Sequence, residues 1–321
     1  MRISCRRVLG TALAVAFGAA PWAATADYPE RAVQFIVPFN AGGGTDVSQR
    51  TFNKYAEPLV GQSIVVVNKP GAGGTTGWAE LVRARPDGYT LATVTVPQQI
   101  VPALAKPRQT GYKLDQLTNI CVYAIVPDVL LVREESDWKT MADLVAHAKA
   151  NPKKLKASNT GTLGADFMTT LYIEHAAGVE FTQVPFTGGS KALQAILAGN
   201  TDVMVASARY AVSQKGKLRT LGIATRQRFP LVEDIPTFVE QGYDVVSQRY
   251  RAIAGPPGLP QSVVEYWEGI CKKVSDDPAF VAEMDKVGQP AGYLGTAETN
   301  EDVERITGVM QRLIDHYKLA E

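Results

Sequence analysis

The sequence has little cysteine, little histidine and almost no net charge. Its 321 residues include three Cys and three His, and 33 Lys and Arg residues are offset by 32 Asp and Glu residues, for a formal charge of +1. No basic block stands out, so binding of nucleic acid through its phosphate backbone is not expected. No Cys or His pair has the spacing of metal ligands, and we expect no metal site.

Motifs for nucleotide cofactors and for covalent catalysis are also missing. The glycine-rich segment 71–76 ends in Thr where the dinucleotide fingerprint requires its third glycine. Segment 188–192 resembles a nucleophile elbow but ends in Ala, so we interpret Ser190 as a helix cap. We therefore predict a protein that has no cofactor and is not an enzyme. The alternative is a secreted α/β serine hydrolase using Ser190 or Ser207, for which no His is placed as a base.

Long hydrophobic runs are absent except at the N-terminus. Three arginines within residues 2–7 precede the apolar stretch 8–20, and Ala24, Thr25 and Ala26 supply small residues for cleavage. The stretch is shorter than the roughly 20 residues that cross a bilayer. We predict that residues 1–26 are a signal peptide, cleaved near Ala26, that exports the protein. The pattern does not decide between Sec and twin-arginine export.

The rest of the chain alternates short apolar runs with helical patterns, and its length suits two domains. This alternation predicts a parallel or mixed sheet covered by helices. Ser262 and Thr299 are expected to cap helices in the more helical C-terminal part. Cys5 lies in the signal peptide. Cys121 in an apolar run and Cys271 on an apolar helix face are compatible with two buried thiols or with a disulfide.

Four glycine-rich loops, each between a predicted strand and a predicted helix, are the most informative feature. They cover residues 38–46, 69–77, 158–165 and 185–191. A helix N-terminus has unpaired N–H groups and a partial positive charge, and glycines let an anion approach the backbone closely. Because open α/β sheets bind ligands at the carboxyl ends of their strands, the four loops together predict an anion site. For any single loop the alternative is that glycine simply makes a tight turn between strand and helix.

Two aromatic side chains at these loops, and two arginines near the expected return between the two domains, add to the prediction. Phe39 and Phe186 each follow a proline and precede a glycine loop, and this matched position favours the walls of a ligand cleft. Arg249 and Arg251 flank Tyr250 and could pair with a carboxylate, although surface ion pairing is the commoner fate of arginine.

The order of several short motifs resembles a known family. The motifs are residues 38–46 followed by Arg50, and then 67–74, 86–91, 184–189, 216–219, 235–237 and 255–258. Together they resemble the extracytoplasmic solute receptors of tripartite tricarboxylate transporters, also called Bug receptors, over essentially the whole chain after the signal peptide. The resemblance implies an α/β type II periplasmic-binding-protein fold, with two lobes of mixed sheets flanked by helices around an interlobe ligand cleft. Lobe 1 would be residues 27–124 plus 248–321, and lobe 2 residues 125–247.

The resemblance also implies a function. Receptors of this family are periplasmic, capture a small organic carboxylate by closure of the two lobes, and deliver it to the membrane components of a tripartite tricarboxylate-type transporter. We expect a monomer. The resemblance further implies that the loops hold the carboxylate through N–H groups, hydroxyls and ordered waters rather than through a salt bridge. A receptor that signals to a membrane sensor is a further alternative. The motifs do not reveal which carboxylate is bound.

Position by position, the resemblance implies ligand-binding residues in both lobes. Asp46 is expected to order its loop or cap its helix rather than touch an anion, because like charges repel. Ala252 replaces a common glycine, and segment 165–167 replaces a helix start that usually contains Ser and His, so ligand identity is open. The implied ligand residues are Phe39, Asn40, Gly43, Thr45, Asp46, Pro97 and Gln98 in lobe 1, and Thr160, Gly161, Thr162, Phe186, Thr187, Gly188 and Ser207 in lobe 2.

Overall fold

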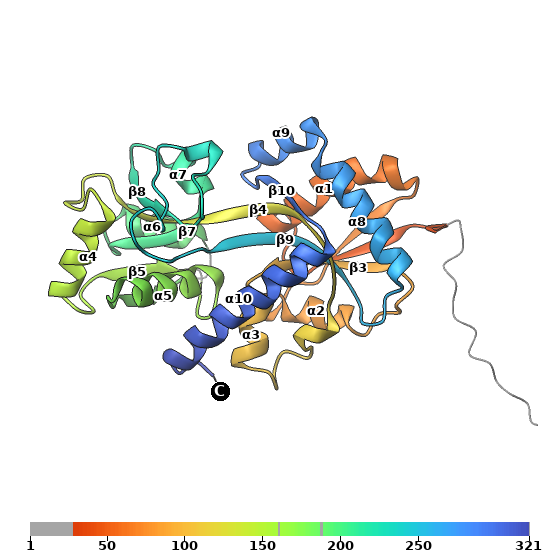
Figure 1. Ribbon diagram of the computed structural model, residues 1–321, viewed down its shortest axis with the longest axis horizontal. Coiled ribbons are helices and arrows are strands. Elements are labelled where there is room, and N and C mark those ends of the chain that lie inside the picture. The colour runs from red at the N-terminus through yellow and green to blue at the C-terminus, as the bar shows by residue number, and fades with distance from the viewer. Residues whose placement is uncertain (1–27, 160, 187–188, 321) are drawn as a thin grey trace, which may run out of the picture.

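A computed structural model describes residues 28–159, 161–186 and 189–320 of the chain. Its elements form two groups, which the long strands β4 and β9 connect by running side by side between them (Figure 1). Within the described residues, no helix is both long enough and apolar enough to span a membrane.

Ten strands form the sheet, and β4 belongs to both groups. Eight strands follow one another in the order β2-β1-β3-β9-β4-β7-β5-β6, and β8 and β10 also pair with β4. Strands β1, β2 and β3 are parallel, as are β5, β6 and β7, whereas β9 is antiparallel to both of its neighbours. The strands are β1 Val33–Val37, β2 Ile64–Asn68, β3 Thr90–Val96, β4 Thr118–Arg133, β5 Lys156–Asn159, β6 Thr182–Pro185, β7 Val203–Ser207, β8 Leu218–Ile223, β9 Gln248–Gly255 and β10 Ala291–Leu294.

Helices cover the sheet in both groups, which confirms the predicted α/β class. Parallel strands need crossover connections, and helices supply them here, as in β1-α1-β2 and β5-α5-β6. The helices are α1 Gly44–Val60, α2 Thr75–Leu81, α3 Ile100–Ala105, α4 Met141–Ala150, α5 Ala165–Ala177, α6 Gly189–Leu197, α7 Arg209–Ser213, α8 Gln261–Ser275, α9 Pro278–Lys286 and α10 Thr296–His316, with short 3-10 turns η1 Ala72–Gly74, η2 Leu114–Gln116 and η3 Pro230–Val232.

Helix α10 links the two groups through the hydrophobic core. Its side chains Ile306, Met310 and Leu313 belong to the same buried cluster as Phe167 and Met168 of α5. The two helices also bring histidines together, since the ring centroids of His175 and His316 lie 4.9 Å apart. Besides β4 and β9, the two groups are therefore joined by helix packing.

A disulfide joins Cys121 in β4 to Cys271 in α8, with Cα atoms 6.5 Å apart. Both residues are fully buried in the cluster that also contains Phe35 and Trp267. Of the two alternatives that the sequence allowed, two buried thiols or a disulfide, the structure therefore shows the disulfide.

Helix starts were predicted less well than the strands. The prediction that Thr299 caps the last helix is wrong, because α10 already begins at Thr296 and Glu298 accepts a hydrogen bond from the Gly295 N–H at 3.0 Å. The caps predicted at Ser262 and Ser190 are also wrong, since both residues lie inside helices that begin one residue earlier. Short polar residues fit a first turn as well as a cap, so spacing alone does not separate the two positions.

Candidate ligand site

The loop after β1 presents the start of α1 without a side-chain cap. The residue before the helix is Gly43, and no side chain accepts a hydrogen bond there. The first-turn carboxylate of Asp46 points back into the loop, where it accepts hydrogen bonds from the Gly42 N–H at 2.8 Å, Asn68 Nδ2 at 2.8 Å and Arg50 Nε at 3.0 Å. Burial alone would raise the pKa of Asp46, but these hydrogen bonds outweigh it and lower the pKa. Asp46 thus orders the loop, as expected.

The other residues predicted in this region lie around the same loop. Asn40 is exposed, Gly43 is partly buried and Thr45 is buried at the helix start. Phe39 is partly buried and its ring packs edge-on against Trp78, with centroids 6.2 Å apart. Its contact is with the hydrophobic core as much as with any cleft.

Pro97 and Gln98 follow β3 at the end of the sheet nearest the second group. The Gln98 side chain donates a hydrogen bond to the Gly73 carbonyl at 3.2 Å, which joins it to the second glycine loop. Pro97 lines a small cavity of about 10 Å³ together with Ser247 and Gln248. The loop after β3 is thereby placed beside the start of β9.

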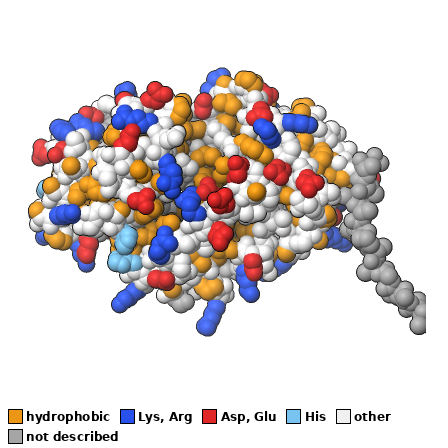
Figure 2. Space-filling model, viewed as in Figure 1, with side chains coloured by type: hydrophobic (Ala, Val, Ile, Leu, Met, Phe, Trp, Pro, Cys, Tyr) orange, Lys and Arg blue, Asp and Glu red, His pale blue; other side chains and the backbone are white. Residues whose placement is uncertain are grey.

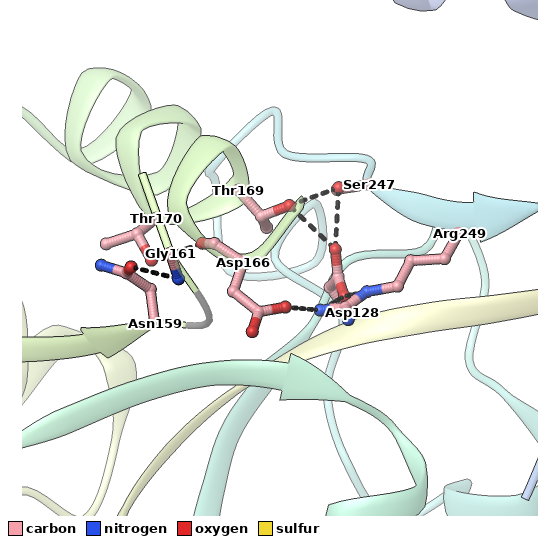
Figure 3. A network of polar contacts seen from close by, with 8 residues as sticks. All are labelled: Asp128, Asn159, Gly161, Asp166, Thr169, Thr170, Ser247 and Arg249. Carbon is pink, nitrogen blue, oxygen red and sulfur yellow. Dashed lines mark hydrogen bonds and ion pairs between the residues drawn. The ribbon is translucent and has the colours of Figure 1, made fainter. Parts of the chain in front are cut away.

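In the second group, α5 also begins without a side-chain cap, after Gly164. Asn159, at the end of β5, organises the two loops there. Its Oδ1 accepts a hydrogen bond from the Gly161 N–H at 3.2 Å (Figure 3). Its carbonyl accepts one from the Phe186 N–H at 2.9 Å. Sequence reasoning missed Asn159, although a polar side chain at the end of a short strand before a glycine loop is a usable signal.

The remaining residues predicted in this group have different surroundings. Thr162 is exposed, and Ser207 is the partly buried last residue of β7. Phe186 packs against the hydrophobic cluster that includes Ala192 and Ile196. In the part of the chain that the structure describes, no hydrogen bond joins Ser190 or Ser207 to a histidine. The predictions for Thr160, Thr187 and Gly188 lie outside the described residues.

A buried charge network lies where β4 and β9 cross between the groups (Figure 3). Arg249 of β9 pairs with Asp128 of β4 at 2.5 Å and with Asp166 in the first turn of α5. Ser247 and Thr169 donate hydrogen bonds to Asp128 at 3.0 and 2.8 Å. Burial alone would lower the pKa of Arg249, but the two carboxylates raise it above its ordinary value. The fate predicted as commoner for Arg249, a surface ion pair, is therefore wrong, because its carboxylate partners are buried.

A cavity of about 660 Å³ opens between the two groups, and none of the predicted ligand residues that the structure describes is among the residues that line it. One wall comes from α6, α7 and η3, and the other from the end of α9 and its link to β10, through residues 285–288 and 290. Much of the lining is apolar, including Leu193, Phe229 and Val287. Its charged residues are Arg209, Lys286 and Asp285. The space-filling view shows both signs of charge mixed over one face of the molecule, with no large patch of one sign (Figure 2).

Two α/β groups joined by crossing strands, with uncapped helix starts beside the junction, define the class of periplasmic solute-binding proteins. A family model described as the tripartite tricarboxylate transporter family receptor matches residues 49–315, and the chain belongs to this family. The family predicted from the motif order is thus confirmed. Among the relatives, BugT of Bordetella pertussis is 30% identical over 262 residues, which cover 80% of each chain.

Solved structures agree with this assignment. A TctC solute binding protein from Polaromonas is 28% identical, with a TM-score of 0.79 over 90% of this chain and 99% of that one. Two structures from Rhodopseudomonas palustris share the fold at 24% identity. They are MatC with bound malate, with a TM-score of 0.74 over 89% of this chain and 100% of that one, and Rpa4515 with adipate, with a TM-score of 0.77 over 90% and 98%. The predicted type II periplasmic-binding-protein fold is confirmed.

Proposed function

We propose that this protein is a monomeric periplasmic receptor that binds a small organic carboxylate without transforming it. The two lobes would be residues 27–124 plus 248–321 and residues 125–247, and they close over the ligand. The receptor then delivers its ligand to the membrane components of a tripartite tricarboxylate-type transporter. The predicted signal peptide and the family membership support this location and these partners.

The proposal depends on the uncapped N-termini of helices α1 and α5. Helices α1 and α5 both begin after a glycine with no side-chain cap, although each has an aspartate in its first turn. Both aspartates have other partners, Asp46 in its own loop and Asp166 on Arg249. The N–H groups of the first turns are therefore left for an external anion, which the helix dipoles attract.

Domain closure is supported by the way the two groups meet. They share β4 and β9, which suits a hinge. At the cavity, Arg209 of α7 already approaches the α9–β10 link, because a Cβ atom placed on Gly288 would lie 2.7 Å from Arg209 Cδ. A ligand that contacts both walls favours the closed form by its differential affinity for that form.

The ligand residues that we propose are those inferred from the family motifs. Of the described ones, they flank the uncapped starts of α1 and α5 or end the neighbouring strands. They are Phe39, Asn40, Gly43, Thr45, Asp46, Pro97 and Gln98 on one side, and Thr160, Gly161, Thr162, Phe186, Thr187, Gly188 and Ser207 on the other.

Thermal unfolding of the mature protein against a panel of carboxylates tests the function. The panel contains malate, adipate, citrate, benzoate and glutamate, each with its amide as control. A ligand at 100 times its Kd adds about 2.7 kcal/mol of stability, enough for a shift of several degrees. We expect a shift with a carboxylate and none with its amide. The panel is repeated after refolding from denaturant, because a co-purified ligand masks binding. No shift in either series would contradict the proposal.

A further inference from the structure

Strand β9 carries two arginines on the same face of the sheet, and their surroundings differ. Residues two apart along a strand point to the same side, so Arg249 and Arg251 lie on one face of β9. Arg249 is held by the buried carboxylates of Asp128 and Asp166. Arg251 forms no ion pair with any residue that the structure describes.

The only hydrogen bond of Arg251 to a described residue is from Nε to Gln289 Oε1, at 3.2 Å. Burial, more than any other influence, lowers its pKa to about 10, and repulsion by Arg249 acts in the same direction, with Tyr123 and Asp128 offsetting a part. At neutral pH the guanidinium is charged and partly buried, and no carboxylate of a described residue pairs with it. An anion from outside the chain would supply the missing counter-charge.

The contacts of Arg251 place it next to the start of α1. Its partner Gln289 also lies against Gly44, since a Cβ atom on Gly44 would be 3.1 Å from Gln289 Nε2. Gln289 stands between Gly288 and Pro290, which both line the 660 Å³ cavity. The Gln289 side chain therefore lies between the Arg251 guanidinium and Gly44, the first residue of α1. Its two neighbours in the chain line the cavity.

We propose that Arg251 is the charge-selecting residue of the ligand site, and that its guanidinium pairs directly with a carboxylate of the bound solute. This inference rests on the proposed function and deepens it. Backbone N–H groups donate to an amide oxygen as well as to a carboxylate, so the helix starts alone distinguish the two poorly. The planar fork of an arginine matches a carboxylate with two parallel hydrogen bonds and adds a full charge. The ligand is therefore an anionic carboxylate held by an ion pair, in which this chain differs from the binding mode that the family resemblance implies.

Isothermal calorimetry on four proteins tests the inference, using the carboxylates of the panel above. They are the wild type, R251Q, R251K and, as matched control, R31Q. Arg31 is exposed, pairs with Asp87 and stacks on Tyr89. Hydrogen bonds to charged groups contribute enough that R251Q should bind about 10- to 100-fold more weakly. R251K, which keeps the charge but not the fork, should fall in between, and R31Q should stay within about twofold of the wild type.

Unfolding of the ligand-free proteins separates binding from folding. Removing an unpaired, partly buried cation should leave the Tm of R251Q equal to that of the wild type or higher. A much lower Tm for both R251Q and R251K would show a structural role and overturn the inference. Unchanged affinity in R251Q, with carboxylates still binding the wild type, would overturn it while the proposed function stands. If the wild type binds no carboxylate of the panel, the proposed function fails first.

Discussion

At the scale of single residues, Glu174 of α5 predicts a dependence of stability on pH. Its Oε1 accepts hydrogen bonds from the Phe181 N–H at 2.7 Å and from Gln183 Nε2 at 3.0 Å. Burial raises the pKa of Glu174 to about 7 despite these donors. Between pH 4.5 and about 7, the folded protein therefore keeps a proton on Glu174 that the unfolded chain has lost. The stabilisation from this proton is fully present below the unfolded pKa of 4.5 and is lost as pH rises through about 7.

E174Q should remove this dependence, because the glutamine amide reproduces the protonated acid. At pH 8 we expect E174Q to be more stable than the wild type by up to about 3 kcal/mol, and near pH 4 the two should be equal. Urea unfolding at both pH values measures the difference. Glu180 is 57% exposed, so E180Q is the matched control and should follow the wild type. Equal stability of E174Q and wild type at pH 8 would contradict the prediction.

Whether the sequence predicts the role of a single residue depends on how far away, along the chain, its hydrogen-bond or ion-pair partners lie. The role of Asp46 was predictable, because Gly42 and Arg50 lie within one turn of it. The different surroundings of Arg249 and Arg251 were not predictable. The carboxylates that hold Arg249 are 121 and 83 residues away in the sequence, and nothing in the local pattern assigns them to one arginine rather than the other.

At the scale of elements, the disulfide ties β4 to α8 across 150 residues of sequence. Closing so long a loop limits the unfolded chain, so we expect its loss to cost about 3 to 5 kcal/mol. Urea unfolding of wild type and C121A/C271A, each with and without reductant, measures this. Reductant should lower the wild type to the level of the double variant and leave the variant unchanged. A wild type that does not respond to reductant would contradict the prediction.

Strands could be predicted from the sequence better than helix ends or strand lengths. Pro127 and Asp128 are residue types that usually interrupt a strand, but β4 runs through them for 16 residues. At this point β4 changes partners, from β9 at Pro127 to β7 at Asp128. A proline without an N–H is tolerated where the ladder changes, and only the tertiary pairing reveals that change.

At the scale of the whole molecule, Gly288 is a position where the two groups touch. It has φ of +66° and lies against Arg209. G288A should weaken carboxylate binding several-fold, since the added methyl group opposes closure, and it should also lower stability by about 1 kcal/mol through backbone strain. Gly258 has φ of +79° with no neighbour near its missing Cβ, so G258A carries the strain without the clash. Calorimetry on both variants measures the affinities, and equal affinities would contradict the prediction.

The position of β9 in the sheet also governs the order in which the molecule can be completed during synthesis. When the ribosome has released residue 247, strands β1 to β4 have all been made, but the strand that lies between β3 and β4 has not. Strands β5 to β8 and helices α4 to α7 fall within residues 141–223, so the second group can form its strands and helices before β9 is made. Its buried Asp128 and Asp166 gain Arg249 only later, and the first group stays incomplete until the C-terminal residues emerge. During synthesis the second group can therefore begin to fold early, whereas the first cannot close until translation is nearly finished.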